Sequence, residues 1–229
     1  MDQVTESIVL APDRVLQIFD EHAQNDRPVL VSHYGEQLAD VLLQEAREHT
    51  ELLIPQIPYI GGDDNPLTHH LIRATTTLAL YRAMQAHGST ARETGGVIYE
   101  AVVRALSSLP FSPSEPPTAA FIRNKREQAR KSQERRYRDD WVWEFVEGDG
   151  EAFDYGYDFY ECAVKKYYEA QGATELLPYF CFLDFVTTRA HGQVLMRTTT
   201  LAEGGEKCDF RLRSATDDDA WPPPFPNGL

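Results

Sequence analysis

Apolar residues recur at intervals of three and four through the first half of the chain, which is the spacing of helices with one buried face. These stripes predict helices near residues 15–23, 35–50, 66–87 and 91–108. Pro55 and Pro58 break the chain after the second helix, and Gly88 ends the third. The first half is therefore predicted to be a helical layer.

The second half changes to the alternating pattern of strands. Two strands are expected in WVWEFVEGD and EAFDYGYDF, joined by a Gly-Asp-Gly turn at 148–150, and two more in VLMRTTTLA and KCDFRLR. Two helices are expected between the pairs, over 160–172 and 173–192. The predicted fold class is α+β: a helical N-terminal layer packed on a small, mainly antiparallel sheet with two further helices.

The expected organisation is a single domain over residues 1–229. Its parts are a helical half (1–110), a Pro-rich connection and basic helix (111–140), an α+β half (141–213) and a tail extended over the surface (214–229). The basic helix, predicted over 118–138, carries eight basic and two acidic residues between Arg123 and Arg138. We interpret it as a solvated helix with ion pairs, and a surface for a partner or a second copy is the alternative.

Charge and composition exclude several classes of protein. The net charge of −14 (22 basic minus 36 acidic residues) disfavours nucleic acid and anionic membranes as partners. No apolar run is long enough to span a membrane, and the acidic N-terminus does not resemble a secretory signal. Three cysteines in such a chain are read as reduced thiols, so a soluble cytoplasmic protein is expected, with a homo-oligomer left open.

Candidate chemistry is concentrated between residues 157 and 211, where charged residues and thiols alternate with aromatic residues. The candidates are Tyr157, Asp158, Glu161, Cys162, Lys165, Cys181, Asp184, Arg197, Cys208 and Arg211. Glu161 and Lys165 are expected to share one helix face, since they are four residues apart. In the last strand, alternation sends Cys208 and Arg211 to opposite faces.

Each of these residues also has a purely structural interpretation, since free cysteines are commonly buried and a Glu–Lys pair commonly lies on the surface. Their density favours a pocket for a small ligand. A zinc site made of the three cysteines and His191 is disfavoured, because separations of 19 and 27 residues are not those of a finger or ribbon. The serine-hydrolase elbow, the P-loop and the Rossmann fingerprint are absent.

Residues 148–213 contain a series of short phrases: Gly-Asp-Gly…Phe-Asp, Glu-Cys…Lys, Gly-Ala-x-Glu-Leu-x-Pro-Tyr, Cys-x-x-Asp, Arg-Thr-x-Thr-Leu-Ala-x-Gly and Cys-Asp-Phe-Arg. With these phrases the segment resembles the signature half of the L-2-amino-thiazoline-4-carboxylic acid hydrolase family. The helix at 66–87 and the Tyr-Ile-Gly-Gly loop before it are similar to the family's first half. The resemblance covers most of the chain.

The resemblance implies hydrolytic opening of a small heterocyclic ring on the route to cysteine, with no cofactor. Such chemistry needs a base to activate water and a cation for the ring carboxylate. Glu161 or Asp184 could serve as the base, and Arg197 or Arg211 could hold the carboxylate. Cys162 could instead attack covalently if Lys165 lowers its pKa. Asp158, Tyr157, Tyr179 and Cys208 complete the expected substrate site.

Two other classes stay open. The family pattern is more distantly similar to fungal sesquiterpene cyclases of secondary metabolism that act on a prenyl diphosphate. In that interpretation Asp158, Glu161 and Asp184 would hold Mg²⁺, and aromatic side chains would stabilise carbocations. The third class is a ligand-binding module without catalysis, whose acids and cysteines serve only the core and the helix ends.

Overall fold

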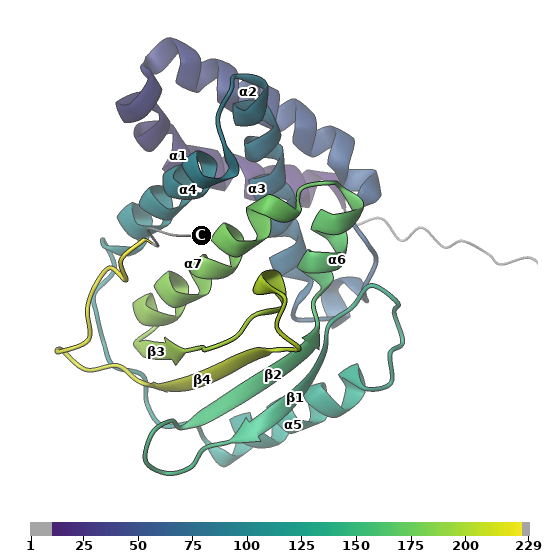
Figure 1. Ribbon diagram of the computed structural model, residues 1–229, viewed down its shortest axis with the longest axis vertical. Coiled ribbons are helices and arrows are strands. Elements are labelled where there is room, and N and C mark those ends of the chain that lie inside the picture. Colours follow the sequence, from purple (N-terminus) through teal and green to yellow (C-terminus); the bar gives the residue numbers. More distant parts are fainter. Residues whose placement is uncertain (1–10, 226–229) are drawn as a thin grey trace, which may run out of the picture. The chain divides into compact units, whose positions relative to one another are not determined.

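The structure, a computed structural model, describes residues 11–225. They belong to two compact units, with the boundary between Thr90 and Ala91. The first unit contains α1 (Pro12–Tyr34), α2 (Glu36–Leu53) and α3 (Thr68–Ala86), with α2 packed against both of the others (Figure 1). Gly35, at a φ of 80°, makes the turn from α1 to α2 in a conformation that favours glycine. The folding of the whole chain as a single domain stays a prediction.

The second unit combines helices with an antiparallel sheet. Its elements are α4 (Ala91–Leu106), α5 (Ala119–Ser132), β1 (Val142–Glu147), β2 (Tyr155–Glu161), α6 (Ala163–Ala170), α7 (Leu177–Ala190), β3 (Gln193–Met196) and β4 (Cys208–Ser214). The four strands of the described chain lie in the order β1-β2-β4-β3, and each neighbouring pair is antiparallel. The predicted α+β class is confirmed.

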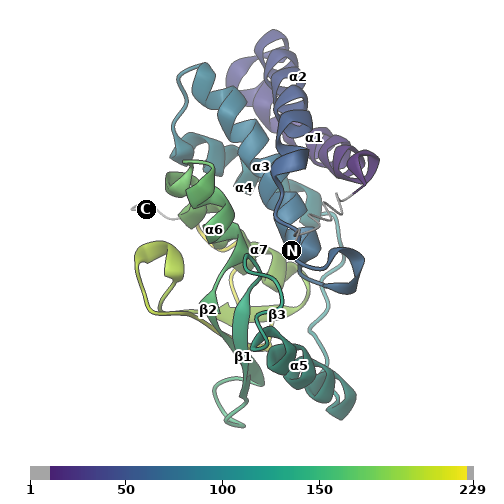
Figure 2. The same cartoon turned by 90° about the vertical axis from the view of Figure 1, so that its right-hand side faces the viewer.

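One face of this sheet is a packed aromatic layer. Strand register places Tyr157 beside both Phe145 and Phe210, and Tyr155 beside Leu212. Helix α5 packs against β1 and α7 against β3 (Figures 1 and 2), and the Phe121 ring of α5 lies 5.1 Å from that of Tyr155. Alternation along the strands turns the intervening charged side chains to the other face.

Several element boundaries differ from the sequence predictions. Helix α1 covers Pro12–Tyr34 rather than 15–23, and β2 begins at Tyr155 rather than at residue 151. The basic helix ends at Ser132 rather than 138, and Arg135 has a φ of 50°. Strand β2 extends through Tyr160 to Glu161, because Glu161 pairs with Val142 of β1, so α6 starts only at Ala163. Strand β3 ends at Met196, and the following threonines form a loop. Within residues 11–225, no helix has the length and apolar character needed to cross a bilayer.

Candidate functional site

A small cavity lies where α7, the loop after β3 and the short helix at Leu201–Glu203 meet. Its volume is about 210 Å³. The lining residues, which we call the threonine pocket, are Pro178, Cys181, Phe182, Phe185, Arg197, Thr198, Thr199, Thr200 and Glu203. Three of its walls are polar: a guanidinium, a threonine run and a carboxylate. Two of the sequence candidates, Cys181 and Arg197, are among them.

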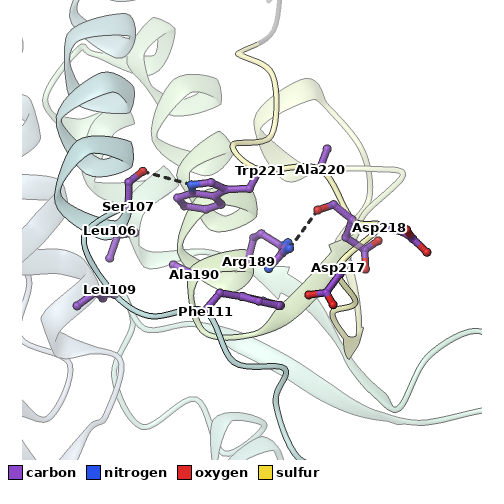
Figure 3. A pocket seen from close by; sticks show the side chains of 11 residues that line it. Leu106, Ser107, Leu109, Phe111, Arg189, Ala190, Asp217, Asp218, Ala220 and Trp221 are labelled. Atoms are coloured by element: carbon purple, nitrogen blue, oxygen red, sulfur yellow. Dashed lines mark hydrogen bonds between the residues drawn. The ribbon is translucent and has the colours of Figure 1, made fainter.

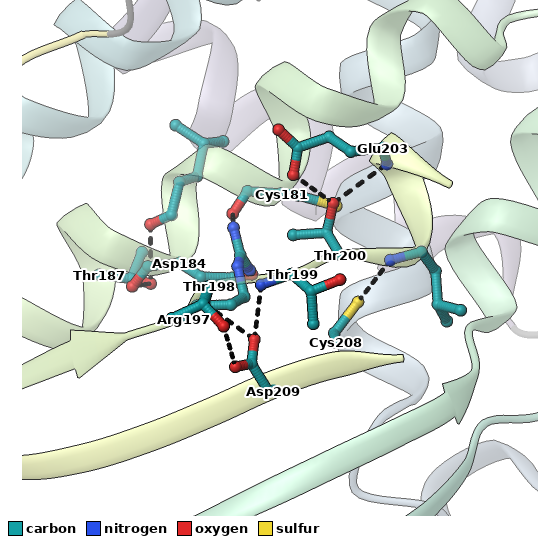
Figure 4. Close-up of polar contacts among 12 residues, drawn as sticks. Cys181, Asp184, Thr187, Arg197, Thr198, Thr199, Thr200, Glu203, Cys208 and Asp209 are labelled. Carbon is teal, nitrogen blue, oxygen red and sulfur yellow. Dashed lines mark hydrogen bonds and ion pairs between the residues drawn. The ribbon is translucent and has the colours of Figure 1, made fainter. Parts of the chain in front are cut away.

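Asp209 of β4 shapes the threonine loop (Figure 4). Its carboxylate accepts hydrogen bonds from the backbone N–H groups of Thr198 (2.9 Å) and Thr199 (2.8 Å), and from the Thr198 hydroxyl (2.6 Å). Burial opposes the ionisation of Asp209, but these bonds outweigh it and hold the pKa of the carboxyl below its usual value. The sequence pattern predicted a strand through these threonines. Instead, the backbone N–H groups of Thr198 and Thr199 bond to the Asp209 side chain.

Thr200 and Glu203 form the far side of the loop. Thr200 caps the short helix by accepting the backbone N–H of Glu203 at 3.1 Å. Its hydroxyl donates to Glu203 Oε2 at 2.7 Å. The Glu203 carboxylate therefore lies in the pocket wall with Oε2 held by the Thr200 hydroxyl. Its other oxygen, Oε1, takes no part in that hydrogen bond. Sequence reasoning missed Glu203, although the phrase RTTTLAEGG that contains it was the available signal.

Arg197 is the cation of the pocket, and its side chain is only 5% exposed. Nη1 donates to Asp184 of α7 at 2.8 Å, and Nη2 donates to the backbone oxygen of Cys181 at 3.0 Å. The guanidinium carbon lies 4.9 Å from the centre of the Phe185 ring and 5.0 Å from that of Phe210. These two bonds use two of the five N–H donors of the guanidinium.

The three cysteines lie near one another in the second unit, and the pKa of each thiol is raised, which favours the protonated form. Burial raises the pKa of Cys162 to about 11 and raises the pKa of Cys181 well above its usual value. Burial also raises the pKa of Cys208, whose sulfur accepts the backbone N–H of Leu201 at 3.2 Å. A thiolate nucleophile is disfavoured at each position, because thiolate is the reactive form.

Asp158 and Arg211 lie on the opposite face of the sheet from the aromatic layer. The Asp158 carboxylate pairs with Lys207 at 2.5 Å and with Arg211 at 2.8 Å. Burial opposes ionisation of Asp158, but the bonds from Arg211 and Lys207 outweigh it and keep the pKa of the carboxyl low. The strand alternation predicted for Cys208 and Arg211 is confirmed, and it separates Asp158 and Arg211 from the threonine pocket.

Glu161 ends β2 instead of lying on a helix, so the predicted helical pairing with Lys165 was wrong. It pairs with Arg135 and, at 2.5 Å, with Lys166, whereas Lys165 pairs with Glu169 one turn along α6. The hydrogen bond from Lys166 and that from Arg135 keep the pKa of Glu161 low. Glu161, Arg135 and Lys166 line a separate cavity of about 620 Å³ beside α6, whereas Lys165 does not.

The two tyrosine candidates also lie in different places. Tyr157 belongs to the aromatic face of the sheet, with its ring 5.3 Å from that of Trp143, and burial raises the pKa of its hydroxyl. Tyr179 is buried in α7 where α4 approaches, and a Cβ at Gly95 would lie 2.6 Å from its own Cβ. Tyr179 packs beside the wall of the threonine pocket but does not line it.

The acids of the predicted magnesium set are not grouped. Asp158, Glu161 and Asp184 each pair with different cations, in three parts of the second unit. Across residues 11–225, no three His, Cys, Asp or Glu side chains are arranged to hold a metal ion. The odd spacing between Asp158 and Glu161 explains part of this, since alternation along β2 turns them to opposite faces.

An α+β unit with a small cavity lined by Arg197, three threonines and Glu203 therefore defines the class of this protein. Residues 69–212 match the family model described as L-2-amino-thiazoline-4-carboxylic acid hydrolase, and the chain belongs to that family. Every residue that lines the threonine pocket lies within the matched range. No curated protein and no solved structure matches the chain. The family name indicates a hydrolase.

Proposed function

We propose that the protein hydrolyses a small amino-thiazoline-type ring that carries a carboxylate, and that the threonine pocket is its active site. The observation that supports this most directly is the size and lining of the pocket. Drug-sized ligands occupy cavities of roughly 300–1,000 Å³. At about 210 Å³, the threonine pocket suits one five-membered ring better than a fifteen-carbon prenyl chain.

Arg197 is the group that would bind the ring carboxylate. Its guanidinium is planar, held between two aromatic rings and oriented by Asp184. Its remaining N–H donors suit a carboxylate, which can accept two parallel hydrogen bonds. In this scheme Asp184 orients Arg197 and is not itself the base.

Glu203 is the carboxylate that would act as general base. It lines the pocket, and the Thr200 hydroxyl fixes one of its oxygens. The carboxylate takes a proton from water as the water oxygen bonds to the ring carbon between nitrogen and sulfur. The bond from that carbon to sulfur then breaks as the added hydroxyl becomes a carbonyl, and the two protons of the water end on the departing sulfur and on the ring nitrogen. The product is carbamoyl-cysteine, formed from one substrate and one water.

Water attack is favoured over attack by a thiol. The raised pKa values of Cys162 and Cys181 keep both sulfurs protonated at neutral pH. Lys165, the residue expected to activate Cys162, bonds to Glu169 instead. A mechanism through Glu203 needs no thiolate.

The test is product analysis by mass spectrometry, with amino-thiazoline carboxylate and farnesyl diphosphate each supplied with and without Mg²⁺. We expect carbamoyl-cysteine from the first substrate. Glu203→Gln should lower kcat by about 10²–10⁴-fold, the usual contribution of a general base. Cys162→Ala should retain turnover. Full activity of Glu203→Gln would contradict the assignment of Glu203 as the general base. A metal-dependent terpene product would contradict the hydrolase function and support the cyclase alternative.

A further inference from the structure

The C-terminal strap, residues 215–225, lies beyond the range that the family model matches. The sequence predicted a tail extended over the surface, and hydrogen bonds hold the start of the strap to the rest of the second unit. Arg213 forms two hydrogen bonds with the Asp219 carboxylate, at 2.9 and 2.6 Å. Nη2 of Arg189, on α7, donates to the backbone oxygens of Thr216 at 3.3 Å and Asp219 at 3.0 Å.

The middle of the strap is attached to α4 and the residues that follow it. The indole N–H of Trp221 donates to the hydroxyl of Ser107 at 3.2 Å (Figure 3). The Tyr99 hydroxyl of α4 donates to the backbone oxygen of Pro223 at 2.7 Å. These bonds lead the chain along α4 to Phe225.

Phe225 is half-buried and packs against a cluster of aromatic rings from α4 and α7. Its ring centre lies 5.1 Å from that of Tyr99, 6.0 Å from that of Tyr179 and 5.9 Å from that of Phe182. The Arg92 guanidinium lies 5.5 Å from the Phe225 ring centre. Such contacts fix both the position and the tilt of the neighbouring rings.

Phe182 connects this cluster to the threonine pocket. It lines the pocket together with Phe185, and the centres of the two rings are 5.4 Å apart. Phe185 in turn lies against the Arg197 guanidinium. Two ring contacts therefore connect Phe225 to Phe185, and a third contact connects Phe185 to Arg197, the residue that would bind the substrate carboxylate.

We propose that Phe225 is a positioning residue that sets the size of the threonine pocket, by holding Phe182 against the pocket from behind. Without this ring, Phe182 can turn into the space that Phe225 occupies, and the apolar wall recedes. The strap is then a determinant of substrate size in this chain. The link to substrate size rests on the proposed function, whereas the link to the pocket wall does not.

Cys181 provides a readout of the wall that needs no substrate. It lines the pocket next to Phe182, and the three cysteines fall in three different tryptic peptides. The experiment compares the rates at which N-ethylmaleimide labels each thiol at one fixed pH in the wild type, Phe225→Ala and Phe225→Leu. In Phe225→Ala we expect labelling of Cys181 alone to be about 2- to 12-fold faster, the range for loss of one aromatic pair. Phe225→Leu retains apolar bulk and should stay nearer the wild type.

Kinetics supply the second readout. Phe225→Ala should raise KM for the amino-thiazoline carboxylate more than it lowers kcat, because the reacting groups are unchanged and only the wall has moved. An unchanged labelling rate of Cys181, or an equal increase at all three cysteines, would overturn the proposal. If Cys181 labelling rises selectively but even the wild type turns over no amino-thiazoline, the wall assignment stands and the proposed substrate fails.

Discussion

Arg197 Nη1 lies 2.8 Å from the carboxylate of Asp184, and this pair joins the end of β3 to the middle of α7. The arginine side chain is 5% exposed and the aspartate side chain 35%. Because the guanidinium is the more deeply buried of the two charges, its stability depends more on the partner. Removal of Asp184 would leave a buried guanidinium without its counter-ion.

Asp184→Ala should destabilise the protein by about 1–3 kcal/mol, less than the loss of one member of a fully buried pair because Asp184 is partly exposed. Chemical denaturation measures this change. Asp218→Asn, which removes an exposed carboxylate on the strap, is the matched control and should be nearly neutral. An equal effect of the two substitutions would contradict the structural role of the pair.

The same pair should affect the thiol in the pocket. Burial raises the pKa of Cys181 most, the negative charge of Asp184 raises it further, and Arg197 lowers it. Asp184→Asn removes the second contribution, so the pKa of Cys181 should fall and the thiol should be alkylated faster at neutral pH. The pH dependence of Cys181 alkylation checks this, and a rise in the pKa would count against the contact.

Cys162 should be unreactive near neutral pH. Burial raises its pKa to about 11, against hydrogen bonds from the backbone of Lys165 and Val164 and from the side chain of Trp141. Alkylation of Cys162 should therefore grow with pH until about pH 11, roughly tenfold per unit below it. Lys165→Met should leave this profile unchanged, because only the backbone of residue 165 contacts the thiol. Slower alkylation of Cys162 in Lys165→Met would instead support the hypothesis that the Lys165 side chain activates this thiol.

Gly95 and Gly96 make a matched pair on α4. A Cβ at Gly95 would lie 2.6 Å from Cβ of Tyr179, whereas nothing lies within 4 Å of a Cβ at Gly96. Gly95→Ala should destabilise by about 1–3 kcal/mol through overpacking. Gly96→Ala should be neutral or stabilise by roughly 0.5–1 kcal/mol, since alanine favours a helix interior. Denaturant midpoints at a common slope distinguish the two, and similar midpoints would mean that α4 and α7 separate at little cost.

Asp26 of α1 should make stability fall as pH rises. Burial raises the pKa of its carboxyl from 3.8 to about 7, so the folded state binds the proton more tightly than the unfolded state. Between about pH 4 and pH 7 the folded protein loses stability from this group, by roughly 2–4 kcal/mol in total. Asp26→Asn should remove that slope. Stability curves of both proteins over this range provide the measurement, and parallel curves would refute the shift.

Much of the second unit could be predicted from local pattern. Alternation in KCDFRLR correctly sends Cys208 to one face and Arg211 to the other, because a strand has a period of two whatever it packs against. The matching phrases of the second half lie within the residues that the family model matches. The connection between β1 and β2 is longer than predicted, since it spans 148–154 rather than 148–150. The predicted helix over 160–172 was wrong at Glu161. That residue pairs with Val142 of β1 and so stays in a strand, although the local sequence pattern is helical.

What the chain determined by itself is the α+β class, the order of the elements and the face of each strand, since these depend on periods of two and 3.6 residues. Only the tertiary structure decided which polar residues meet. The pairing of Arg197 with Asp184, the bonds from the threonine loop to Asp209 and the contact of Phe225 with Phe182 each join residues of different elements or loops. Such contacts form when whole elements pack, and no local spacing encodes them.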